Sequence, residues 1–170
     1  MIRKYKEWQP KIHSETYVDP TAVITGNVSI SQQVGVYAYA TLRGDDEVIK
    51  IGSNTNIQEH VVIHVSKSHK TTIGEGVSIG HGAILHGCDI HNHVLIGMHA
   101  TVLDGAVIGE HSIVAAGSLC PPNKIYPPNS MIMGSPAKVV RELTEVERSH
   151  IITNAAHYVM LSNEYKKQSL

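Results

Sequence analysis

Twelve histidines in a chain of 170 residues are the side chains best suited to chemistry at neutral pH, because the imidazole pKa lies closest to it. Among them, His81 follows His64 by 17 residues and precedes His86 by five. Neutral imidazoles are the commonest metal ligands in proteins, and a set of three leaves a divalent ion an open position for water. Whether these three side chains can meet depends on the elements that carry them.

The sequence repeats with a period of six residues, and an aliphatic side chain marks each repeat. This period fits neither an α-helix nor an array of hairpins and is typical of a hexapeptide β-helix, in which three hexads make one triangular coil. The marked positions are Val18, Ile24, Ile30, Val36, Leu42, Ile51, Ile57, Ile63, Ile73, Ile79, Leu85, Ile90, Ile96, Val102, Ile108 and Val114. These hexads predict an all-β fold of about five to six coils. The absence of phenylalanine fits an interior built from uniform, mid-sized aliphatic layers.

The ends of the repeat predict one domain over residues 1–170 with capped ends. We expect an N-terminal cap over 1–17, the β-helix over 18–125 and a proline-rich connecting segment over 126–143. A Thr-x-x-Glu capping box and apolar residues at helical spacing then predict a C-terminal α-helix over 144–168.

The hexad register places the three histidines on two faces of the coil. His64 and His86 each directly follow the aliphatic residue of one face, so they form an outward pair in successive coils, continued by Arg43. His81 lies on another face, in the place that Glu59 takes one coil earlier. Within one triangular prism, side chains on two different faces cannot easily meet at one ion. In three prisms around a threefold axis, one face of each prism meets another face of its neighbour. The register therefore favours a metal site shared between subunits of a homotrimer; the alternative is hydrogen bonding in an ordinary trimer seam.

Bulk properties narrow the classes of partner. A net charge of −1 gives no support for a nucleic-acid or anionic-membrane partner. We find no signal peptide and no run of about 18 apolar residues. Cys88 and Cys120 form no CxxC motif, which fits a reducing compartment. The expectation is a cytoplasmic protein without a membrane partner.

Several motifs, in order along the chain, resemble the γ-class carbonic anhydrase family. They are Leu42-Arg43-Gly44-Asp45, Asn56-Ile57-Gln58-Glu59, Ile63-His64-Val65, Ile79-Gly80-His81-Gly82-Ala83-Ile84-Leu85-His86-Gly87-Cys88 and Gly134-Ser135-Pro136-Ala137-Lys138. The likeness covers roughly residues 10 to 165. It implies a left-handed parallel β-helix, a homotrimer, and zinc (or iron or cobalt) bound at subunit interfaces by His64, His81 and His86. It also implies that carbon dioxide is hydrated to bicarbonate.

The same resemblance implies roles for further residues. Arg43 and Asp45 correspond to an ion pair at the subunit interface, which supports the trimer and the site; the alternative is a purely structural pair. Gln58 resembles the residue that positions the nucleophilic hydroxide, and Asn56 resembles its polar neighbour, or else is a corner residue. Tyr158 resembles a tyrosine that reaches the site from the terminal helix; the alternative is a residue that packs the helix.

The chain also departs from the family's pattern. The well-characterised archaeal form has a long acidic loop with a proton-shuttling glutamate, whereas residues 66–70 form a short basic loop here. Asp46 or Glu47 can take that role, or both are simply solvated. Two other functions therefore stay open. One is a coenzyme A-dependent acyltransferase of the hexapeptide class, which uses a lone catalytic histidine, and the other is a metal-binding structural protein with little turnover.

Overall fold

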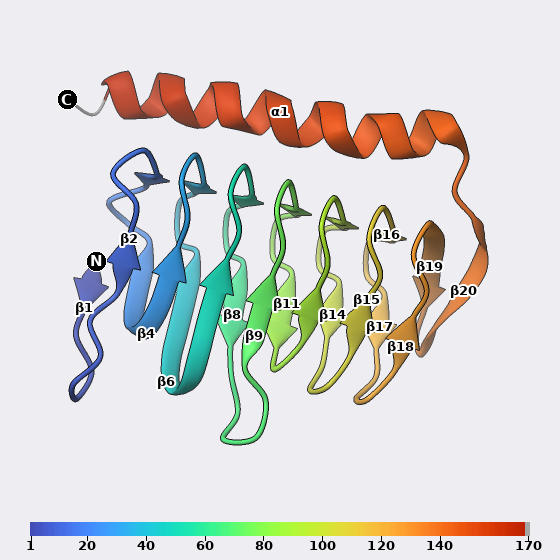
Figure 1. Ribbon diagram of the computed structural model, residues 1–170, viewed down its shortest axis with the longest axis horizontal. Helices are drawn as coiled ribbons and strands as arrows, with labels where there is room; N and C mark the ends of the chain where they lie inside the picture. Colours follow the sequence, from blue (N-terminus) through green and yellow to red (C-terminus); the bar gives the residue numbers. More distant parts are fainter. Residues whose placement is uncertain (169–170) are drawn as a thin grey trace.

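A computed structural model describes residues 1–168 of the chain. Short strands stack in parallel into one long solenoid, and a single helix runs along its side (Figure 1). The predicted β-helix with a C-terminal α-helix is confirmed. Within residues 1–168 there is no helix whose length and apolarity would let it cross a membrane.

The strands form two hydrogen-bonded sheets. The twelve-stranded sheet consists of β1 (Ile2–Arg3), β2 (Lys11–Ile12), β4 (Val23–Ile30), β6 (Thr41–Ile51), β8 (Val62–His64), β9 (Thr71–Ile73), β11 (Ile84–His86), β12 (Asp89–Ile90), β14 (Thr101–Val102), β15 (Val107–Ile108), β17 (Leu119–Cys120) and β18 (Ile125–Tyr126). It covers two sides of the triangle, because β6 pairs with β8 at its start and with β9 at its end. The eight-stranded sheet consists of β3 (Tyr17–Val18), β5 (Gly35–Val36), β7 (Asn56–Ile57), β10 (Ser78–Ile79), β13 (Leu95–Ile96), β16 (Ile113–Val114), β19 (Ser130–Gly134) and β20 (Ala137–Glu142).

The solenoid is longer than the sequence predicted. Seven parallel strands stack in the eight-stranded sheet before β20 closes it in the antiparallel direction, which gives seven coils rather than five to six. Strands on either side of 18–125 belong to the stack, so the β-helix extends past both predicted limits. The prolines that suggested its end lie in the turns between strands, namely Pro121, Pro122, Pro127 and Pro128. A proline in a turn removes no N–H that the ladder needs, so it does not interrupt the repeat.

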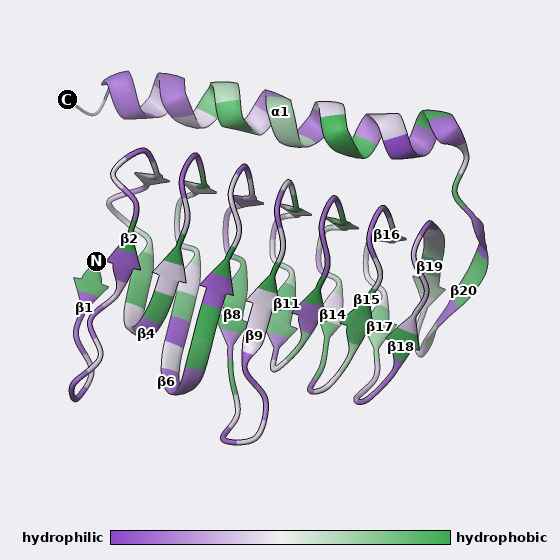
Figure 2. Ribbon diagram, viewed as in Figure 1, coloured by the Kyte–Doolittle hydropathy of each residue, from purple (hydrophilic) through white to green (hydrophobic). Residues whose placement is uncertain are grey.

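The core is a set of aliphatic columns. Leu42, Ile63, Leu85 and Val102 pair in successive coils and are fully buried, as the hexad register predicts. Figure 2 shows the hydrophobic colour concentrated in the strands and the hydrophilic colour in many of the turns. The largest fully buried side chain is Tyr126 in the last coils, where its hydroxyl donates to the Ala137 carbonyl oxygen.

Four of the remaining histidines occupy corners of the coils. His60, His93, His99 and His111 all have positive φ angles of 53–61°. Histidine, like asparagine, tolerates this left-handed conformation better than most residues do. The backbone of the turn therefore accounts for these four side chains.

Helix α1 (Glu145–Gln168) begins at the predicted capping box. The Thr144 N–H donates to Glu147 Oε2 at 2.9 Å, and the Glu147 N–H donates to Thr144 Oγ1 at 3.3 Å. Arg141 holds the same carboxylate with two hydrogen bonds of 2.8 and 2.7 Å. From there α1 runs back along the solenoid and contacts β3, β5, β7 and β10 of its own chain (Figure 1). The capping box thus sets the point from which α1 lies against the first coils.

We expect the stability that Glu147 provides to disappear in acid. Hydrogen bonds from Arg141 and then from Thr144 lower the pKa of this carboxyl from 4.5 to about 2. A lowered pKa in the folded state stabilises the protein above the unfolded value, and the effect is lost as the pH falls toward about 2. Glu147→Gln should therefore lower the melting temperature at pH 7, and this difference from the parent should vanish near pH 2. Glu145→Gln, in the same helical turn, is the control; equal melting temperatures for the two variants at pH 7 would contradict the assignment.

Candidate metal centre

Two histidines lie one above the other on the outside of the solenoid. His64 ends β8 and His86 ends β11, and these strands pair in register, which the hexad spacing predicted. The ring centroids are 4.9 Å apart. His64 Nδ1 lies 3.0 Å from His86 Nε2, and both side chains are partly buried. The two ring nitrogens therefore face each other across a gap that one small cation can bridge.

A carboxylate holds the other nitrogen of each ring. Asp45 Oδ1 lies 2.9 Å from His64 Nε2, and Asp104 Oδ1 lies 2.5 Å from His86 Nδ1. Because an ionised carboxylate only accepts hydrogen bonds, these two ring nitrogens donate, and the facing nitrogens carry lone pairs. Two lone pairs 3.0 Å apart repel each other unless a proton or a cation lies between them. The donor set thus fits a divalent metal ion, whose histidine ligands commonly have such carboxylate partners.

Arg43 completes this part of the site from the coil before His64. Its guanidinium binds Asp45 at 2.5 Å and reaches within 3.4 Å of His64 Nδ1, with its side chain half exposed. Partial burial acts to raise the pKa of Asp45, but hydrogen bonds from His64 and Arg43 outweigh it and lower that pKa. The pair forms within one chain because the two residues lie two positions apart on β6. That it lies at a subunit interface, as the family resemblance implies, stays a prediction.

The third histidine lies on a different face. His81 follows β10 in the eight-stranded sheet, and its Nδ1 lies 2.7 Å from Oε2 of Glu59, one coil earlier. Within residues 1–168, no three side chains of histidine, cysteine, aspartate or glutamate converge on a metal-binding group. One chain thus carries a pair and a separate single histidine. That they meet across a subunit interface stays a prediction.

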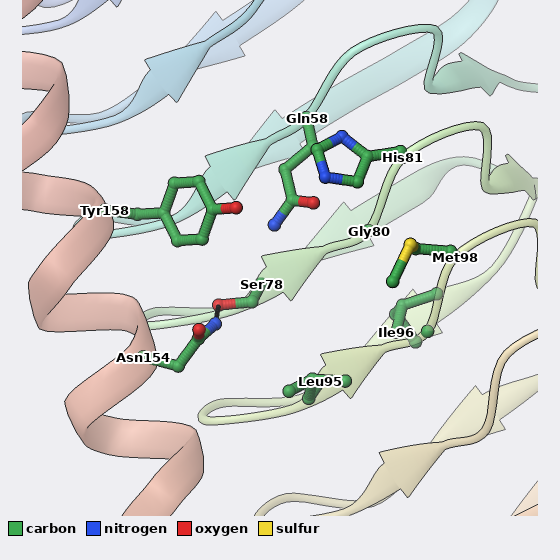
Figure 3. A pocket seen from close by; sticks show the side chains of 10 residues that line it. Gln58, Ser78, Gly80, His81, Leu95, Ile96, Met98, Asn154 and Tyr158 are labelled. Atoms are coloured by element: carbon green, nitrogen blue, oxygen red, sulfur yellow. Dashed lines mark hydrogen bonds between the residues drawn. The ribbon is translucent and has the colours of Figure 1, made fainter.

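A cavity of about 200 Å³ opens beside His81, between the eight-stranded sheet and α1. Gln58 and Tyr158 line it together with His81, and Figure 3 shows the Tyr158 hydroxyl pointing from the helix toward Gln58. Burial, and then the charge of Glu59, raise the pKa of Tyr158, so this phenol stays protonated at neutral pH. The structure therefore brings His81, which the hexad register had placed, together with Gln58 and Tyr158, which rested on the resemblance alone.

A network of side-chain amides around the Ser78 hydroxyl borders this cavity. Gln58 Nε2 donates to Asn56 Oδ1 at 3.0 Å, and Asn56 Nδ2 donates to Ser78 Oγ at 2.8 Å. Asn154 Nδ2 of α1 donates to the same hydroxyl oxygen at 2.9 Å. Asn56 lies within β7 rather than at a corner and is 1% exposed, so its alternative assignment as a corner residue is wrong.

Three residues of the site were not predicted from the sequence. Ser78 pairs with Asn56 in the same hexad register that located the histidines, so this register could have found it. Asn154 precedes Tyr158 by four residues and therefore lies on the same face of α1. Asp104 is an acidic residue one coil beyond His86, where the register places it against Gly87.

Glu47 and Asp46, the two candidate proton acceptors in β6, differ in their contacts. Glu47 Oε2 accepts a hydrogen bond from the Val48 N–H at 2.9 Å. Asp46 is exposed directly beside Asp45. Of the two, Asp46 is the more accessible to buffer.

Sequence comparison connects this chain with curated proteins. It is 52% identical over 141 residues to a protein of Methanocaldococcus jannaschii named as a probable carbonic anhydrase, covering 83% of this chain and 89% of the relative. It is 38% identical over 166 residues to the mitochondrial gamma carbonic anhydrase 1 of Arabidopsis thaliana, covering 94% of this chain. This chain spans only 60% of that plant protein's length. The model of the bacterial transferase hexapeptide (six repeats) matches residues 87–121.

Solved structures share the fold. A Bacillus cereus protein, provisionally named an acetyltransferase, is 38% identical and superposes with a TM-score of 0.96 over 98% of this chain and 97% of that protein. AntD, an N-acyltransferase of Bacillus cereus solved with coenzyme A, has a TM-score of 0.70, covers 93% of this chain and 91% of its own, and is 19% identical. At that identity the likeness to AntD shows the fold alone.

We expect Asp104→Asn to weaken zinc binding roughly ten- to a hundredfold, because the carboxylate that fixes the His86 ring is replaced by a neutral amide. Affinity is measured by competition with a chromophoric chelator. Asp89→Asn is the matched control, since Asp89 is 3.9 Å from His91 on another side of the coil. Equal zinc affinity in the two variants would show that Asp104 does not support the site.

Proposed function

This chain belongs to the γ-class carbonic anhydrase family, and from that premise we propose that it hydrates carbon dioxide to bicarbonate with a divalent metal ion. The observation that carries the proposal is the in-register pair of His64 and His86, each ring held by its own carboxylate. A metal ion bound between His64 Nδ1 and His86 Nε2 would accept the lone pairs of both nitrogens.

We propose that the ion is held by His64 and His86 of one chain and His81 of a neighbour in a homotrimer. The surface around the pair supports this association. Val62 and Ile84 precede His64 and His86 by two residues and pair with each other, so they lie on the same outward face; they are 40% and 42% exposed. An apolar patch beside polar ligands is typical of an interface. Zinc, iron and cobalt all suit imidazole ligands, and zinc is the ion we propose.

When bound, such an ion supplies a water molecule activated for attack on carbon dioxide at neutral pH. We propose that Gln58 orients that water. Its Nε2 is engaged by Asn56, and among residues 1–168 nothing donates to its Oε1, which is left to accept a hydrogen bond. Arg43 adds a half-exposed positive charge beside the histidine pair, which attracts the bicarbonate anion.

Turnover also needs a group that accepts the proton released from water. We propose Asp46 for this step, because it is exposed next to Asp45, and Asp45 contacts His64 directly. Tyr158 is protonated at neutral pH, so it can donate a hydrogen bond within the cavity but not accept this proton as a base.

The second candidate function is acyl transfer from coenzyme A, favoured by the provisional name of the Bacillus cereus structure. That class needs a lone catalytic histidine and no metal. The carboxylate-backed pair of His64 and His86 favours the metal-dependent function, because a lone base leaves the second histidine without a role.

The proposal is tested on protein purified without oxygen and reloaded with zinc, cobalt or iron. We expect bound metal and rapid hydration of carbon dioxide by stopped flow. His81→Ala should lose metal and hydration while the oligomer stays folded. His99→Ala is the control, because His99 occupies a corner one coil later.

Two outcomes would overturn parts of this proposal. Full metal content in His81→Ala would remove His81 from the site. A fully loaded parent protein without hydration above the buffer rate would refute the carbonic anhydrase function, and turnover of acetyl-coenzyme A would then favour the second candidate.

A further inference from the structure

We propose that Ser78 and Asn154 are positioning residues for Gln58, so that helix α1 sets the placement of the carboxamide that faces the reacting water. The inference rests on the proposed function, and it gives a role to two residues that line the cavity beside His81. It connects the terminal helix to the site by a continuous set of hydrogen bonds.

The bonds run in one line from the helix to the cavity. Asn154 Nδ2 and Asn56 Nδ2 both donate to Ser78 Oγ, at 2.9 and 2.8 Å. With its Nδ2 used in this way, Asn56 presents Oδ1 to Gln58, whose Nε2 donates to it at 3.0 Å. Gln58, which lines the cavity, is the last residue of this series, and its Oε1 is the atom not used in it. A reversed Asn56 amide would place its Nδ2 against Gln58 Nε2, donor against donor.

Burial makes this network hard to replace by water. Asn56 and Ser78 are each 1% exposed, and Gln58 is 6% exposed. In a buried region a hydrogen bond is stronger than in water, and an amide that loses its partner must move to find another. Removal of the Ser78 hydroxyl would leave two amides without their acceptor, and the disturbance would pass through Asn56 to Gln58.

The position of Asn154 on α1 gives it this role. In the next coil the place of Asn56 and Ser78 is taken by Leu95, so the polar column ends at β10. Asn154 approaches Ser78 from the helix, and Tyr158 lies one turn further along, directed toward Gln58 (Figure 3). One face of α1 thus supplies both the end of the network and a wall of the cavity.

The test reads the Gln58 side chain directly in metal-free protein. The chain has five glutamines, so nitrogen-15 labelling of glutamine gives few side-chain NH2 signals, and Gln58→Glu identifies the one from Gln58. In the parent we expect a slowly exchanging Gln58 Nε2 hydrogen. Ser78→Ala and Asn154→Ala should speed its exchange at least tenfold. In zinc-loaded protein they should lower kcat/KM for hydration roughly ten- to a hundredfold at unchanged zinc content, because orientation is lost.

Matched variants separate positioning from general packing. Ser78→Thr keeps the hydroxyl and should restore slow exchange and activity. Ser162→Ala removes a buried hydroxyl on the same helix that donates to the Val159 carbonyl oxygen, and it should change neither readout.

Parent-like exchange in Asn154→Ala, or parent-like kcat/KM with zinc bound, would overturn the proposal. Should Ser78→Ala fail to fold, Asn154→Ala decides alone, since Asn154 lies on the partly exposed side of α1. Should the zinc-loaded parent hydrate no carbon dioxide, the proposed function fails, and the exchange measurement still decides whether the network holds Gln58.

Discussion

Backbone hydrogen bonding between successive coils fixes which side chain lies above which, and every feature of this protein depends on that register. The pairing that stacks Leu42, Ile63 and Leu85 inside the solenoid also stacks Arg43, His64 and His86 outside it. A shift of the pairing register by one residue would turn the core side chains outward, and it would also separate His64 from His86. Core and candidate site are therefore two consequences of the same ladder.

The ladder also explains why one chain does not complete the site. Residues that lie on one side of the triangle meet easily between coils, as His64 meets His86 and Glu59 meets His81. Residues on different sides are kept apart by the core, and among residues 1–168 no third ligand joins the pair. Helix α1 covers the side of the solenoid that carries His81, and its Asn154 and Tyr158 side chains line the cavity there. We propose that association between subunits brings the remaining two faces together.

The sequence predicted the features that follow from periodicity and failed where contacts depend on packing between elements. The period of six located the columns and the histidine pair, and the Thr-x-x-Glu motif located the start of α1. The sequence analysis underestimated the number of coils. The prolines that suggested an end lie in turns, where they do not interrupt the hydrogen bonding between coils. Asp104 was missed since an aspartate near a turn has no pattern of its own. Asn154 was missed because its partner lies 76 residues away and depends on how the helix docks.

The central claim, that the metal site is shared between chains, is tested most directly by subunit complementation. A His81→Ala chain keeps the pair, and a His64→Ala/His86→Ala chain keeps the single histidine. Co-expressed with different affinity tags, they give mixed oligomers that tandem purification isolates for metal analysis. We expect that neither variant binds metal alone and that each mixed trimer regains one ion. Mixed trimers that stay free of metal, or metal retained by either variant alone, would contradict a shared site.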